Sequence, residues 1–214
     1  MPALADLTFL RLRRLKGRAE AFLASTRGVA AVEFAMVLPV MVLMYLGMTE
    51  LTFAVNTDRK ITLLSRTLAD LTGRATSVNT SEMDAIFGAS LAVMAPYNGD
   101  AVKMVVSSIV VKDTGQVSGG QPVLKGTVCW SVAKGPGNPP GLAKGTVVPI
   151  PDGFQTADSS FIRADVTLDY APIFGSSVMQ WTTGASQLPL SEQTPWPVRN
   201  VKEVVWQGTT PCLG

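Results

Sequence analysis

The side chain most often used in acid–base catalysis is missing from this sequence. The chain has no histidine, which removes the commonest general base and the commonest transition-metal ligand. Asp165 and Asp169 would share one face of an expected strand, where carboxylates are most often solvated. Neither a phosphate-binding Gly-Lys-Ser/Thr loop nor a Gly-x-Ser-x-Gly motif occurs in the sequence. We therefore expect no enzyme activity, no cofactor and no metal site.

The two cysteines, Cys129 and Cys212, offer a different chemistry. An even cysteine count in an exported region is typical of a disulfide, whereas a reducing compartment would keep both residues as thiols. A bond between them would close a loop of 84 residues, counted from 129 to 212 inclusive. The chain-entropy relation gives such a loop about 4–5 kcal/mol of stabilisation before any native-state strain is subtracted.

Glu33 is the acid with the most unusual surroundings. It lies near the beginning of an almost entirely apolar stretch, Val29 to Val55. A carboxylate inside a membrane span costs about 2.5–3.5 kcal/mol on the insertion scale, so it usually has a partner or a task. The two interpretations are a hydrated position at the membrane interface near Arg27 and a specific role, and position alone does not separate them.

The apolar stretch around Glu33 predicts a single membrane-spanning helix. Such a helix needs about 20 mostly apolar residues, and Val29 to Thr49 meets that requirement. Two acidic and six basic residues precede Gly28. The basic ones are Arg11, Arg13, Arg14, Lys16, Arg18 and Arg27. The positive-inside rule predicts that they remain in the cytoplasm and that the C-terminal part lies outside. A secretory signal peptide would have a shorter apolar region with its cleavage site after it.

The residues around the start of this stretch resemble the processing site of type IV prepilins. In Arg27-Gly28-Val29-Ala30-Ala31-Val32-Glu33-Phe34 a basic leader ends in glycine, and glutamate is the fifth residue after it. More narrowly, RGVAAVEFAMVLPVMV is similar to the N-terminal signature of TadE-like minor pseudopilins of the tight-adherence (Flp-type) pilus system. The resemblance implies cleavage between Gly28 and Val29. It also implies that Glu33 takes part in processing and in subunit registration, by pairing with the α-amine of an adjacent subunit.

Further segments resemble the same family: DAIFGASLAVMAPY (84–97), Val128 to Ser131, Leu168 to Pro172 and, more weakly, Pro197 to Arg199. The N-terminal block is shared with TadF- and TadG-like proteins. The resemblance implies a bacterial inner-membrane protein with a cytoplasmic N-terminus and a periplasmic C-terminal domain. The implied partners are prepilin peptidase, other pilins and pseudopilins, assembly platform proteins and membrane lipid. The nearly neutral remainder of the chain gives no support for nucleic-acid binding.

The outer part reads as an α+β domain of the pilin-like kind. Apolar spacing predicts that the helix continues to Thr72, with Asn56 to Asp58 as an alternative break. Ser81 is expected to cap a second helix ending before Pro96. Strands are expected at 103–112, 123–132, 161–170 and 198–206, with a turn at 113–115 and an irregular loop at 135–141.

These patterns divide the chain into four parts. They are a basic cytoplasmic leader (1–28), a transmembrane helix (29–55), a helical stalk with the second helix (56–98) and a periplasmic β-rich domain (99–214). The leading hypothesis is a minor pseudopilin or assembly component of a tight-adherence pilus, acting through helix–helix packing and periplasmic contacts. The alternative is an uncleaved, single-span periplasmic ligand-binding domain.

Overall fold

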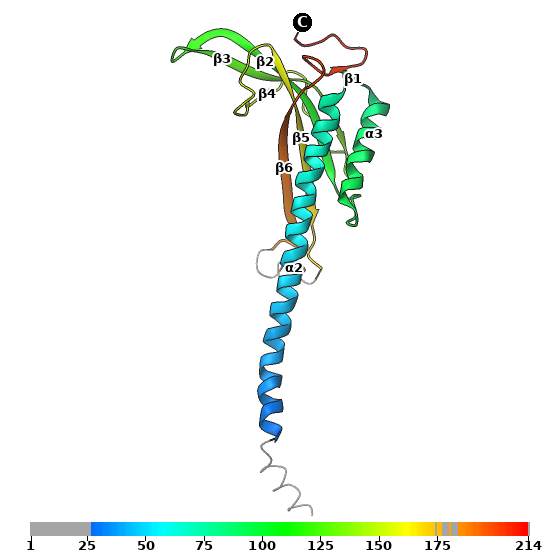
Figure 1. Cartoon of the computed structure of the whole chain (residues 1–214), viewed down its shortest axis with the longest axis vertical. Helices are drawn as coiled ribbons and strands as arrows, with labels where there is room; N and C mark the ends of the chain where they lie inside the picture. Colours follow the sequence, from blue (N-terminus) through cyan, green and yellow to red (C-terminus); the bar gives the residue numbers. More distant parts are fainter. Residues whose placement is uncertain (1–26, 174, 177–179, 181–183, 214) are drawn as a thin grey trace, which may run out of the picture. The chain divides into compact units, whose positions relative to one another are not determined.

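The computed structural model describes residues 27–173, 175–176, 180 and 184–213, so most of the expected leader lies outside the described residues. The chain forms two compact units, residues 1–49 and 50–214. Helix α2 (Arg27–Arg74) runs through both units (Figure 1). The elements are a long apolar helix, a short second helix and an antiparallel five-stranded sheet, which confirms the predicted α+β class.

In the second unit, α2 continues without interruption through Asn56 to Asp58, so the alternative break does not occur. Thr57 is buried there, and its hydroxyl donates to the Phe53 carbonyl at 2.8 Å. That bond satisfies a polar side chain without leaving the helix. The buried positions recur at helical spacing and form one stripe facing the sheet: Thr57, Ile61, Leu64, Ser65, Leu68 and Thr72.

The C-terminal end of α2 approaches the sheet closely at Gly73. A Cβ placed on Gly73 would lie 2.9 Å from the Pro197 carbonyl oxygen. Any other residue would force the helix end and the strand apart, so glycine is required here for packing. The Arg199 amide donates to the Gly73 carbonyl at 3.0 Å, which ties the following loop to the same point.

Helix α3 (Thr80–Leu91) begins one residue earlier than Ser81, and the predicted cap is wrong. The N-cap is Asn79, whose side chain accepts from the Glu82 amide at 2.9 Å while the Glu82 carboxylate accepts from the Asn79 amide at 3.0 Å. This reciprocal capping box outcompetes a serine inside the first turn. A short 3₁₀ turn, η1 (Ala92–Met94), follows the helix.

The main sheet is antiparallel with strand order β4-β3-β2-β5-β6. Its strands are β2 (Lys103–Ser118), β3 (Gln121–Lys134), β4 (Val147–Val148), β5 (Ser159–Tyr170) and β6 (Leu188–Pro197). A separate parallel pair joins β1 (Ser77–Val78) to β7 (Val205–Trp206). The irregular loop predicted at 135–141 contains no strand or helix.

The turn between β2 and β3 lies at Gly119 and Gly120, and the turn expected at Asp113 to Gly115 is wrong. Both turn glycines have positive φ, 60° and 81°, which a two-residue hairpin turn of type I′ requires. The Asp113 side chain accepts from the Gly115 amide at 2.8 Å, so this segment forms a local irregularity within the strand pair. The turn-forming residues predicted here do bend the backbone locally, but the result is a bulge within the strand pair and not the hairpin turn.

The last predicted strand, 198–206, is also wrong. The strand at this edge is β6, and residues 198–204 form a loop that leads to the two-residue β7. Three prolines, Pro189, Pro195 and Pro197, occur at positions of the same parity along β6. Prolines are tolerated on edge strands because their missing N–H groups can face away from the ladder. These prolines are the reason why the sequence did not predict a strand here. They also prevent another strand from pairing with this edge of the sheet.

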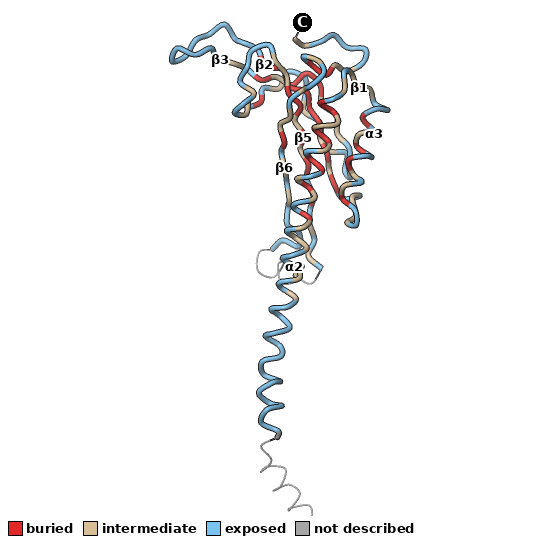
Figure 2. The backbone as a smooth tube through the Cα atoms, in the orientation of Figure 1, coloured by how far each residue is buried: buried red, intermediate tan, exposed pale blue. Residues whose placement is uncertain are grey.

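Two apolar clusters lie on the two faces of the sheet, and both are visible as buried segments in Figure 2. In the larger cluster, alternate residues of β5 (Ile162, Ala164, Val166) meet α2 and α3, as the predicted alternation requires. Helix α3 contributes Met83 and Phe87 to it. The smaller cluster joins β2, β3 and β5 on the opposite face and is covered by Leu142, Ile150 and Phe154.

Candidate membrane and subunit-contact site

The first unit consists, as far as the structure describes it, of the α2 segment from Arg27 to Thr49. These 23 residues would extend about 34 Å at 1.5 Å per residue, which matches a hydrocarbon core of about 30 Å. Large apolar side chains are exposed all around the segment, for example Met36, Leu43 and Tyr45 at 70–75%. A helix that is apolar on every side is typical of a membrane span. Among the described residues, α2 is the one helix that is long enough and apolar enough to span a membrane.

Gly28 lies at the start of α2, where the fold imposes no steric need for glycine. A Cβ added to it would meet no heavy atom within 4 Å. Glycine is about 1 kcal/mol less favourable than alanine inside a helix. Neither packing nor helix propensity therefore explains glycine at this position, in contrast to Gly73. Val29, directly after it, is 55% exposed.

Glu33 is exposed on the surface of α2. Within the part of the chain that the structure describes, no ion pair involves its carboxylate. A carboxylate at this depth of an apolar helix remains in need of water or of a cation from another molecule. The role of Glu33 in registration stays a prediction. Six residues further along, Pro39 is accommodated without interrupting the helix, as is common in membrane spans.

At the beginning of the second unit, Glu50 holds the chain that leaves β5. Its Oε1 accepts a hydrogen bond from the Tyr170 hydroxyl at 3.2 Å and another from the Ile173 amide at 2.6 Å. Desolvation by burial, and then the negative charge of Glu50, raise the pKa of Tyr170 above its usual value. The tyrosine therefore stays protonated and able to donate. The sequence reading singled out Tyr170-Ala171-Pro172 but not Glu50, because 120 residues separate the two partners.

Asp70 forms a second junction between α2 and the sheet. Its carboxylate pairs with Arg74 and with Arg199, the latter at 3.1 Å, and accepts from the Trp196 indole at 3.0 Å. The Arg74 hydrogen bond is the largest influence and lowers the pKa of Asp70 below its ordinary value. Burial opposes that effect, and Trp196 and Arg199 reinforce it. This cluster fixes the end of α2 to β6 and to the loop after it.

Cys129 and Cys212 form a disulfide with a Cα–Cα distance of 6.0 Å. The buried Glu203 carboxylate accepts from the Cys212 amide at 3.0 Å and from the Leu213 amide at 2.8 Å. The Glu203 carboxylate and the two cysteine sulfurs lie close together, as metal ligands would. Because the sulfurs are bonded to each other, the group instead forms a cross-link that attaches the C-terminal segment to β3. Sequence reasoning missed Glu203, which lies in a segment expected to be a strand.

The strand segment Val128 to Ser131, which resembled the family, lies beside this cross-link. Trp130 is buried, and its indole nitrogen donates to the Val204 carbonyl at 2.7 Å. Its ring centroid lies 5.7 Å from that of Trp206. The Ser131 hydroxyl contacts the Ser107 hydroxyl at 2.9 Å and accepts from the Leu142 amide at 3.0 Å. Trp130 therefore holds the C-terminal segment onto β3, whereas Ser131 connects β3 to β2 and to the loop at Leu142.

The carboxylates considered above for chemistry are engaged in surface ion pairs. Asp165 pairs with Arg163 and accepts from Gln193, whereas Asp169 pairs with Lys103 at 3.1 Å. The Arg163–Asp165 pair is half-buried, and the Lys103–Asp169 pair is exposed to solvent. These pairs do not bring the two carboxylates onto a common ligand.

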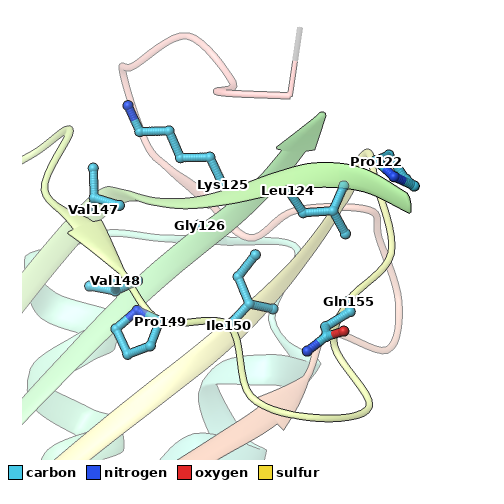
Figure 3. A pocket seen from close by; sticks show the side chains of 9 residues that line it. All are labelled: Pro122, Leu124, Lys125, Gly126, Val147, Val148, Pro149, Ile150 and Gln155. Carbon is cyan, nitrogen blue, oxygen red and sulfur yellow. The ribbon is translucent and has the colours of Figure 1, made fainter. Parts of the chain in front are cut away.

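A pocket of about 370 Å³ lies between β3, β4 and the following loop (Figure 3). Leu124 and Ile150 point toward each other across it, and Val148 and Pro149 line one side. Among the described lining residues, Lys125 is the one ionisable group. The hollow therefore combines apolar side chains with polar groups, among them Gln155, and its described lining lacks the paired ionisable groups that acid–base chemistry requires.

The apolar segment of α2 is consistent with a single membrane span, and an α+β domain follows it. Residues 28–70 match the model of the family described as TadE-like protein. The match begins at Gly28 and ends in the second unit's part of α2, and it confirms the resemblance to TadE-like pilus proteins over this segment. No curated protein and no solved structure matches the chain.

Proposed function

We propose that this protein is a minor pseudopilin or assembly component of a tight-adherence pilus, made as a precursor and cleaved after Gly28 by a prepilin peptidase. The observation that carries the proposal is the TadE-like match over 28–70 on a helix whose first part is apolar on all sides. In this function the basic leader stays in the cytoplasm of a bacterial inner membrane, and the second unit is periplasmic. The span holds the protein in the membrane until other pilus components recruit it.

The position of Gly28 supports the cleavage step. The fold does not need glycine there, because no atom would oppose a side chain. A peptidase that cuts after glycine would account for its presence at this position. Cleavage would free an α-amine on Val29, four residues before Glu33. Placed in lipid, that amine and the Glu33 carboxylate of an adjacent subunit would each lose water, so pairing them would favour one axial register between helices.

The exposed apolar surface of α2 supports helix–helix packing as the mode of action. The apolar surface extends into the second unit at Leu51, Val55 and Leu63, which are 43–64% exposed. These side chains lie outside the buried stripe that packs on the sheet. A neighbouring helix could contact them in the same way as it contacts the span. The partners would be other pilins and pseudopilins and the assembly platform.

A complementation experiment tests the function. In a strain that lacks this protein, the wild type is expected to restore piliation, whereas Gly28→Val is expected not to. Gly47→Ala is the matched control, because Gly47 lies in the same helix and also has no atom within 4 Å of an added Cβ. Full piliation with Gly28→Val would refute the processing step. Normal piliation without the protein would refute the function itself.

The pocket of Figure 3 is the observation that favours the alternative, a permanently tethered periplasmic binding domain. In that function the leader would remain on the chain and Gly28→Val would behave like the wild type. The two functions therefore predict different outcomes for Gly28→Val, a variant that leaves the fold unchanged.

A further inference from the structure

The chain that leaves β5 is held beside the point where α2 enters the second unit (Figure 1). The Ile173 amide lies 2.6 Å from Glu50 Oε1, and a Cβ on Gly175 would lie 3.9 Å from Glu50 Cγ. Glu50 directly follows Thr49, the last residue of the first unit. Adjacent Cα atoms are 3.8 Å apart, so the peptide chain itself keeps Ile173 near the end of the apolar segment, whatever the orientation of the two units.

Large apolar side chains are exposed at this level of the second unit. Ile173 and Leu51 are each 64% exposed, and Leu188 is 43% exposed. Leu188 is the strand partner of Tyr170, whose hydroxyl binds Glu50, and Leu51 directly follows Glu50 in the chain. We call Leu51, Ile173 and Leu188 the apolar rim. Tyr170 beside it is half-buried, with its polar end occupied by Glu50.

The sequence next to the apolar rim lacks charge. From Tyr170 to Leu190 there is no Asp, Glu, Lys or Arg, although 16% of the whole chain is charged. The connection that precedes β5, at the other end of this strand, is different, since it contains Asp152 and Asp158. A charge-free connection with exposed apolar residues is unfavourable in water and favourable at the boundary between headgroups and acyl chains.

We propose that the apolar rim is a lipid-binding surface that rests on the bilayer spanned by α2. The occupant is the headgroup–acyl boundary of the outer leaflet, which accepts Leu51, Ile173 and Leu188 while Glu50 stays bonded to Tyr170 and Ile173. The Glu50 hydrogen bonds keep the connection at membrane level. The proposal requires that α2 spans the membrane, but it does not require cleavage of the leader or entry into a pilus.

The continuity of this surface with the span favours lipid over a protein partner. The last residues of the apolar segment, such as Tyr45 and Met48, are exposed and would be covered by lipid in the membrane. Leu51 follows Met48 by three positions, so it lies on nearly the same face of the same helix. A lipid surface that covers Met48 therefore reaches the rim without any further component.

The experiment uses the full chain in lipid vesicles, with a polarity-sensitive fluorophore attached to one introduced cysteine. The reporters are Ile173→Cys and Leu188→Cys, and the native cysteines stay in their disulfide under non-reducing conditions. Val117→Cys is the matched aqueous control, because Val117 is 72% exposed on the β2 arm. Leu43→Cys, in the apolar segment and 70% exposed, reports the span itself. Nitroxide-labelled lipids carrying the quencher at headgroup depth supply the readout.

At both rim positions we expect a blue-shifted emission and quenching several-fold stronger than at Val117. Equal quenching at Ile173, Leu188 and Val117, with strong quenching at Leu43, would overturn the rim proposal and leave the span intact. Absence of quenching at Leu43 would overturn both. A blue shift at the rim that grows with protein density in the vesicle, without lipid quenching, would mean that a second copy covers the surface. That outcome also overturns the proposal.

Discussion

Removal of the Cys129–Cys212 disulfide should strongly destabilise the second unit. The cysteines are 83 positions apart, so the bond closes a loop of 84 residues when both are counted. The chain-entropy relation assigns such a loop about 4–5 kcal/mol at 25 °C. Truncating Cys129, which is buried, adds about 1 kcal/mol of lost packing in a Cys129→Ala/Cys212→Ala double variant. Since domains are stable by about 5–15 kcal/mol in total, the loss is a large fraction.

The assay is urea unfolding of the full chain in nanodiscs, followed by tryptophan fluorescence. Trp130 follows Cys129 directly and lies 5.7 Å from Trp206, so the signal reports on this region. With an m-value of about 2 kcal/mol/M, the loss expected for the double variant lowers the urea midpoint by about 2.5–3 M.

Reduced wild type is the matched control, because it keeps both cysteine side chains and lacks only the bond. Its urea midpoint is expected to be slightly higher than that of the double variant. If oxidised wild type, reduced wild type and the double variant all share one midpoint, the assignment of the C-terminal segment as a covalently pinned part of the domain is refuted.

Three further substitutions test separate contacts. Arg74 lowers the pKa of Asp70, so this carboxylate stabilises the fold fully above its unfolded pKa of about 4 and loses that effect as the pH falls through the lower folded pKa. Asp70→Asn should therefore cost about 1–2 kcal/mol at pH 7 and less near pH 3, and equal urea-midpoint differences at both pH values would contradict this. Gly73→Ala should lower the free energy of unfolding by about 1–3 kcal/mol, because the added Cβ collides with the Pro197 carbonyl of β6. Gly88→Ala, whose added Cβ meets no atom, should be neutral or stabilising. Calorimetry on both variants distinguishes a packing effect from an effect of helix propensity. Glu33→Gln should leave membrane insertion intact and reduce co-purification with pilus components at least tenfold, about 1.4 kcal/mol or more, and wild-type recovery would remove the registration role.

The parts of the fold that the sequence predicted correctly depend on patterns within one element. The apolar run after Gly28 and the alternation in Phe161 to Tyr170 each repeat a single period many times, so neighbouring contacts cannot easily override them. The wrong predictions involve competition between local signals. Asp113 to Gly115 has turn chemistry, but two consecutive glycines six positions later, 119 and 120, fit a hairpin turn better.

The contacts that sequence reasoning missed follow no regular pattern. Glu50 meets Tyr170, 120 positions away, only after the sheet has formed, and Glu203 meets Cys212, nine positions away, in a segment without regular secondary structure. No spacing rule connects residues 120 positions apart, and a carboxylate at the end of an apolar helix is indistinguishable from a solvated one until its partner is placed. Strand β6 was missed because its prolines contradict a central strand and are compatible only with an edge.

The measurement that tests the central claim most directly is the N-terminal sequence, with the intact mass, of the protein extracted from its native membrane. The proposed function predicts a mature chain that begins at Val29, with residues 1–28 absent. The Gly28→Val variant, extracted in the same way, should retain them. A wild-type chain that still begins at Met1 while it resides in the membrane would contradict the account and favour a permanently tethered domain.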